Sequence, residues 1–120
     1  MKNIKDNLEI KLRIQIGKFA QFGPGKVNLM EAIEKTGSIS AAAKKIGMSY
    51  RKAWKLINDL NRISKSKMVI TSIGGKGSGG TELTVTGKKF VDLFRKMEGK
   101  TLVAIKNEKI ELEKILNDLK

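Results

Sequence analysis

Apolar and polar residues alternate strictly near the start of the chain. From Leu8 to Ile16 every second residue is leucine or isoleucine, and the residues between them are charged or carry an amide. Such a period of two predicts a β-strand with one buried and one solvated face. The Gly-Pro-Gly sequence within 22–25 then predicts a turn after this strand.

The period changes to three and four in the next segment, which predicts two helices separated by a tight turn. Apolar residues at helical spacing cover about 27–35, and Gly37 follows in a position that suits a helix C-terminus. Ser40 can cap a short alanine-rich helix over 41–46, which Gly47 then ends.

A longer helix is expected after Ser49, whose hydroxyl can cap its first turn. Apolar residues recur in it at the spacing of one buried helix face, and charged residues occupy most other positions. The apolar residues are Ala53, Ile57, Leu60 and, beside them, Leu56. This helix is therefore expected to lie on the surface with its basic side towards solvent.

The period returns to two after Ser64 and predicts a β-hairpin. Its strands are expected over 68–73 and 82–85. The tip between them, 74–80, is rich in glycine and carries Lys76. Because glycine has no side chain, such a tip can pass close to another molecule's backbone.

Two further helical stretches are expected after the hairpin. Thr86 can cap the first, and the sequence at 99–101 is expected to kink or interrupt the helix before the second begins. Their apolar stripe is longer than a domain of this size can cover, so we interpret it as a pairing surface for a second copy of the chain; folding back onto the chain's own core is the alternative. The residues expected in this surface are Phe90, Phe94, Met97, Leu102, Ile105, Leu112, Leu116 and Leu119.

The order of these elements is that of a winged helix-turn-helix: helix, short helix, tight turn, longer basic helix and hairpin. We therefore expect an α+β fold that is mainly helical, with an N-terminal strand and C-terminal dimerisation helices. The DNA-binding domain is expected over residues 1–85 and the dimerisation segment over residues 86–120.

Composition excludes several classes of chemistry. The chain has no cysteine and no histidine, so Cys/His zinc sites, thiol nucleophiles, disulfides and His-based triads cannot be built. We expect no enzymatic activity, no metal site and no cofactor. No apolar run is long enough to span a bilayer, and the N-terminus does not resemble a secretory signal. A cytoplasmic protein that does not contact membranes is therefore expected.

The charge points to a polyanionic partner. The 25 basic and 12 acidic residues give a net charge of +13, and the segment 38–80 carries much of the excess because its only acidic residue is Asp59. Nucleic acid is the first candidate and the partner that we expect; an anionic membrane surface is the second candidate and is not expected to be bound.

These basic residues have defined places in a helix-turn-helix that binds double-stranded DNA. The longer helix would place its first turns in the major groove, where Arg51 can bind a guanine edge or a phosphate. Lys52 and Lys55 are expected to hold phosphates, although a solvated helix face is the alternative, and Trp54 is expected to brace the core. The full set of expected DNA contacts is Ser38, Ser40, Lys44, Ser49, Tyr50, Arg51, Lys52, Lys55, Lys76 and Ser78.

Three motifs occur in order along the chain. They are SIS-x-AAK at 38–44, SY-x-x-AW at 49–54 and GGKG-x-GG at 74–80. Further matching positions are Asn58, Leu60, Asn61, Leu83, Thr84 and Gly87. Over roughly residues 26–98 the chain resembles the DNA-binding domain of the molybdate-responsive ModE family of transcriptional regulators. More distantly, the GSIS-AAA stretch is similar to the helix-turn-helix of LysR-type regulators. The resemblance implies a winged helix-turn-helix, a homodimer held by the helices after the wing, and promoter binding.

The sequence departs from full-length ModE in two ways. It ends at Lys120, without the C-terminal domains with which full-length ModE binds molybdate, so we expect a stand-alone form with no molybdate site in this chain. Ser78 stands in the wing where glycine is expected. The alternative function is a non-specific architectural DNA- or RNA-binding protein, but the few aromatic residues argue against RNA modules that stack bases.

Overall fold

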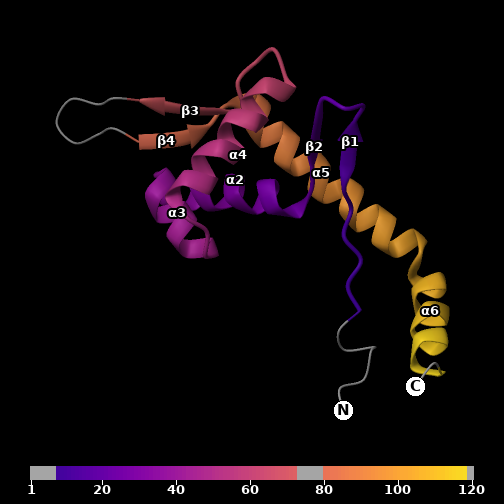
Figure 1. Ribbon diagram of the computed structural model, residues 1–120. Helices are drawn as coiled ribbons and strands as arrows, with labels where there is room; N and C mark the ends of the chain where they lie inside the picture. Colours follow the sequence, from indigo (N-terminus) through magenta and orange to yellow (C-terminus); the bar gives the residue numbers. More distant parts are fainter. Residues whose placement is uncertain (1–7, 73–79, 119–120) are drawn as a thin grey trace.

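Three helices form the centre of the molecule (Figure 1). The computed structural model describes residues 8–72 and 80–118. Helix α2 spans Pro24–Thr36, α3 spans Ile39–Ile46 and α4 spans Tyr50–Ile63. The buried side chains that join these helices are Val27, Leu29, Met30 and Ile33 from α2, Ile39, Ala42 and Ala43 from α3, and Ala53, Ile57 and Leu60 from α4.

Glycines end the first two helices as expected. Gly37 (φ 76°) and Gly47 (φ 72°) adopt the left-handed conformation, which glycine reaches at little cost because it has no Cβ. The expected cap of α3 is wrong: Ser38, not Ser40, precedes the helix, and its Oγ accepts a hydrogen bond from a backbone amide of the first turn at 2.9 Å. The earlier start places Ile39 inside α3, where its side chain is buried.

Helix α4 begins where the sequence predicts. Ser49 caps it, because the Ser49 Oγ accepts a hydrogen bond from the Lys52 amide at 3.1 Å. Its expected buried face is also confirmed, with Ala53, Ile57 and Leu60 in the core and Leu56 half-buried beside them. The basic side of α4 therefore faces solvent.

An antiparallel hairpin follows α4. Strand β3 spans Val69–Ser72, β4 spans Gly80–Leu83, and Val69 pairs with Leu83. The return strand expected over 82–85 is displaced towards the N-terminus, because the chain enters helix α5 at Val85. The expected tip residues Lys76 and Ser78 lie outside the described residues.

Asn61 ties this hairpin to α4. Its Oδ1 accepts hydrogen bonds from the amides of Met68 at 2.9 Å and Val69 at 3.1 Å, and its Nδ2 donates to the Val69 carbonyl at 3.0 Å. On the other strand, the Thr81 amide donates to the Gly37 carbonyl at the end of α2, also at 2.9 Å. The position of the hairpin is therefore fixed from both sides.

The N-terminal strand expected over 8–16 is mostly wrong as a strand. Only Ile14–Ile16 (β1) has strand structure, and it pairs with Ala20–Phe22 (β2) to form a short hairpin. The alternation still describes burial from Leu8 to Gln15, where apolar side chains are half-buried and polar ones are exposed. Phe22 joins this hairpin to the core, since its ring centroid lies 4.7 Å from that of Phe90.

Helix α5 (Val85–Ala104) carries the chain away from the core towards α6 (Lys106–Asp118), as Figure 1 shows. Its expected cap is wrong: Thr84, not Thr86, accepts a hydrogen bond from the Gly87 amide at 3.0 Å. The interruption expected at 99–101 is also wrong, because α5 continues through these residues and ends at Ala104. Within the helix, the Thr101 hydroxyl donates to the carbonyl one turn before it at 2.7 Å.

Arg95 fastens α5 to α2. Its guanidinium forms a two-point ion pair with the Glu31 carboxylate (2.7 and 3.1 Å), and it also donates to Asn28 Oδ1 at 2.6 Å and to Glu98 Oε1 at 2.9 Å. The hydrogen bonds from Arg95 lower the pKa of Glu31 against the opposing effect of burial.

The arrangement of α2, α3, α4 and the β3–β4 hairpin is a winged helix-turn-helix within an α+β fold, as expected. None of the helices within residues 8–72 and 80–118 combines the length and the apolar character that crossing a membrane requires. The same residues contain no group of three acidic side chains placed to hold a metal ion.

Candidate nucleic-acid interface

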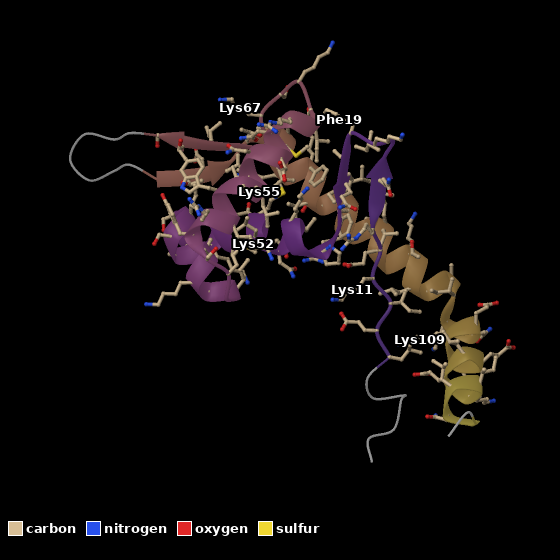
Figure 2. All side chains as sticks on the ribbon, viewed as in Figure 1. Lys11, Phe19, Lys52, Lys55, Lys67 and Lys109 are labelled. Atoms are coloured by element: carbon tan, nitrogen blue, oxygen red, sulfur yellow. The ribbon has the colours of Figure 1, made fainter. Side chains whose placement is uncertain are left out.

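The first two turns of α4 present three cations to solvent. Arg51, Lys52 and Lys55 are all exposed, and Figure 2 shows the two lysines one above the other along this helix. The Ser49 hydroxyl at the start of the helix is used in its cap. In a helix-turn-helix the N-terminal turns of the second helix are the part that enters the major groove. The structure therefore places these predicted contact residues on the surface that this docking mode requires.

Tyr50 and Trp54 lie together on the same helix. The Tyr50 side chain is 54% exposed, and its ring meets the Trp54 ring edge-on with centroids 6.2 Å apart. Trp54 itself is half-buried against the hydrophobic core. This confirms the bracing role that the sequence predicted for Trp54 and leaves Tyr50 free to touch a ligand.

The predicted DNA-contact residues on α3 differ in how accessible they are. Ser40 and Lys44 are exposed. Ser38 is half-buried, and its hydroxyl oxygen already accepts the capping hydrogen bond of α3. Ser38 is therefore available to a ligand chiefly as a hydroxyl donor.

Two hairpins flank α4, on its two sides in Figure 1. The β3–β4 hairpin lies on one side, held by Asn61. The β1–β2 hairpin lies on the other. Of the predicted wing contacts, Lys76 and Ser78 lie outside the described residues, so the structure describes only the strands that carry them.

A basic groove lies between α4 and the β1–β2 hairpin. It encloses about 540 Å³, and the residues that line it are Arg13, Gln21, Phe22, Gly23, Gly25, Lys26, Lys52, Lys55, Leu56 and Asp59. Four of these side chains are cationic and one is anionic. Sequence reasoning named Lys52 and Lys55 but missed Arg13 and Lys26, because no local pattern shows that the N-terminal segment folds against α4.

The apolar residues expected to pair two copies of the chain lie in different environments. Phe94 is 2% exposed in the protein's own core, and Phe90 packs half-buried on Phe22. Met97, Leu102 and Leu112 are exposed, Ile105 and Leu116 are half-buried, and Leu119 lies outside the described residues. Other exposed apolar side chains on α5 and α6, outside this expected set, are Val85, Leu93, Val103, Ile110 and Ile115.

No protein-family model matches the chain. Curated relatives include the transcriptional regulator ModE of Yersinia pestis, 36% identical over 110 residues, which are 89% of this chain and 41% of the relative. The DNA-binding transcriptional dual regulator ModE of Escherichia coli K12 is 39% identical over 85 residues, 71% of this chain and 32% of the relative. The ModE regulator of Haemophilus influenzae is 31% identical over 113 residues, 92% of this chain and 44% of the relative. The chain thus spans less than half the length of these relatives.

Solved structures with a similar fold include two mutants of MepR from S. aureus. A mutant from a multidrug-resistant clinical isolate has a TM-score of 0.52 at 19% identity, and the match covers 98% of this chain and 92% of that one. Another mutant, bound to an oligodeoxyribonucleotide, has a TM-score of 0.50 at 21% identity, with 80% and 76% covered. At this identity the likeness supports the winged helix-turn-helix fold alone.

Proposed function

Because the chain is homologous to ModE transcriptional regulators, we propose that it regulates transcription by binding specific sites in double-stranded DNA as a homodimer. The observation that carries this proposal is the exposed basic start of α4 within a helix-turn-helix. The proposal assigns no catalytic activity to the chain. A promoter-binding protein acts where the chromosome is, so a cytoplasmic location is part of the proposal.

Recognition would combine sequence readout with phosphate contacts. Arg51 can donate two parallel hydrogen bonds to a guanine edge in the major groove. Lys52 and Lys55 would neutralise phosphates, and Ser40 and Lys44 of α3 would lie along the backbone. The remaining members of the proposed contact set are Ser38, Ser49, Tyr50, Lys76 and Ser78.

We propose different roles for the two parts of the fold. Residues 1–85 would bind DNA, and residues 86–120 would pair two copies through the exposed apolar side chains of α5 and α6. Met97, Leu102 and Leu112 are each about 40% exposed, which is a large apolar surface for helices that leave the core. We expect Leu102→Asp to lower the mass measured by light scattering to that of a monomer, whereas Lys106→Asp on α6 leaves it unchanged.

Selection from randomised duplexes tests sequence specificity without knowledge of the target. We expect enrichment of a palindromic site with half-sites about one helical turn apart. Arg51→Lys keeps the positive charge but loses the paired hydrogen bonds, so discrimination against a half-site guanine substitution should fall by about 1–3 kcal/mol, while the salt dependence stays the same. No enrichment by the parent protein would favour the alternative, an architectural protein that coats nucleic acid.

A further inference from the structure

The basic groove between α4 and the β1–β2 hairpin is built from three separate parts of the chain. Arg13 precedes β1, Lys26 lies in the first turn of α2, and Lys52 and Lys55 come from α4. A second hollow continues along α4 from the same groove, because the two share Gln21, Lys26 and Asp59. Its lining residues are Phe19, Ala20, Gln21, Lys26, Asp59 and Arg62.

The cationic side chains of this groove form no ion pairs within residues 8–72 and 80–118, because none of their nitrogens lies within 4.0 Å of a carboxylate oxygen there. Two of them are held instead by neutral groups of the hairpin: Lys26 Nζ donates to the Gln21 carbonyl at 2.6 Å, and Arg13 Nη1 donates to Gln21 Oε1 at 3.4 Å. A concave surface with four cations and one carboxylate attracts an anion.

DNA is the anion that the position of the groove favours. Lys52 and Lys55 line the groove and also lie next to Arg51 on the turns of α4 proposed to enter the major groove. A strand bordering that major groove would therefore pass the mouth of the basic groove. The β1–β2 hairpin stands on the flank of α4 opposite the wing (Figure 1).

We propose that the groove receives a phosphate of the DNA backbone, so that the β1–β2 hairpin clamps the duplex opposite the wing. This inference rests on the proposed function and adds a partner for residues that a helix-turn-helix and its wing do not include. Arg13 and Lys26 would bind the phosphate from the hairpin side, and Lys52 and Lys55 from the helix side. Asp59 would oppose the contact.

Variants that remove a positive or a negative charge from the groove should change DNA affinity in opposite directions. The double variant Arg13→Gln/Lys26→Gln should weaken binding of selected and random duplexes alike by about tenfold, and flatten the slope of log K against log salt by about one or more. Asp59→Asn should tighten binding, an effect that a loss of folding cannot produce. The matched control is Lys11→Gln/Lys96→Gln, which removes two exposed charges outside the groove and should change neither quantity comparably.

A position-specific probe gives an independent readout. Because the chain has no cysteine, Gln21→Cys provides a unique attachment point in the groove for a chelate that generates hydroxyl radicals. We expect cleavage of the DNA backbone beside each half-site. The same chelate on Glu108→Cys, an exposed position on α6, should give no localised cleavage.

The outcomes separate the inference from the function on which it rests. If Arg51→Lys loses discrimination but the groove variants bind as the parent does and Gln21→Cys cleaves nothing, the clamp is wrong and the proposed function stands. If the groove variants lose binding only to a labelled poly-glutamate peptide, the groove serves acidic peptides and the clamp is equally wrong. If the parent binds no duplex even at low salt, both fail together.

Discussion

Removal of the Asn61 side chain should loosen the β3–β4 hairpin from α4. The carboxamide makes three hydrogen bonds, to the amides of Met68 and Val69 and to the Val69 carbonyl. Met68 and Val69 are 3% and 2% exposed, so water cannot easily replace these bonds. With a net loss of about 1 kcal/mol per hydrogen bond and a further penalty for unpaired buried amides, Asn61→Ala should cost about 2–4 kcal/mol of unfolding free energy.

Urea unfolding at fixed protein concentration, followed by Trp54 fluorescence, measures this cost. For an m-value of about 1.5 kcal/mol/M, a loss of about 3 kcal/mol moves the midpoint by about 2 M. Fixed concentration matters because dimerisation would also stabilise the fold.

Two further variants show whether the hydrogen bonds are responsible. Asn61→Asp keeps the acceptor for both amides but sets a carboxylate oxygen against the Val69 carbonyl, so at neutral pH it should cost about as much as Asn61→Ala. At acidic pH the protonated carboxyl can donate to this carbonyl again, so the difference from the parent should shrink. Asn58→Ala removes the same group from an exposed position of α4 and should change stability by no more than about 0.5 kcal/mol. A cost for Asn61→Ala no larger than that for Asn58→Ala would refute the reasoning.

Two other predictions concern how α5 is attached. A Cβ at Gly87 would clash with the Met68 carbonyl oxygen, so Gly87→Ala should destabilise the fold by about 2 kcal/mol or more in the same urea assay. Gly99→Ala, where a Cβ would meet nothing within 4 Å, should stabilise the fold slightly. The ion pair of Arg95 with Glu31 lowers the folded-state pKa of this carboxyl, so its stabilisation is present above the unfolded-state pKa and is lost as pH falls through the folded-state value. Arg95→Gln should therefore cost about 1 kcal/mol at neutral pH and progressively less below about pH 4.5, and a cost independent of pH would exclude this mechanism.

Local sequence signals located most helices correctly but not always their first residues. Ser49 was predictable as a cap because no competing cap residue lies close to it before the basic helix. At α3 and α5, Ser38 competes with Ser40 and Thr84 with Thr86, and burial of side chains further along decides between them. Such burial is a tertiary property, so local pattern alone selected the wrong residue in both cases.

The basic groove and the ion pairs of Arg95 could not be predicted from the sequence either, because both depend on tertiary packing. Arg13 comes to lie near Lys52 because Phe22 packs the β1–β2 hairpin onto α5, and Lys26 because α2 packs against α4. Arg95 meets Glu31 across 64 positions of the chain. The alternation predicted which side chains face the protein from Leu8 to Gln15, whereas Ile16 is exposed. It could not show that strand partners exist for only the last three positions of 8–16.

The central claim is that the exposed start of α4 reads bases in the major groove. Replacing a half-site guanine by 7-deazaguanine removes the N7 acceptor from that groove and leaves base pairing intact. If the claim holds, this substitution weakens binding of the parent protein at one or more half-site guanines and leaves Arg51→Ala unaffected at the same position. Equal affinity of the parent for the normal and the modified duplex at every guanine of the selected site would contradict it.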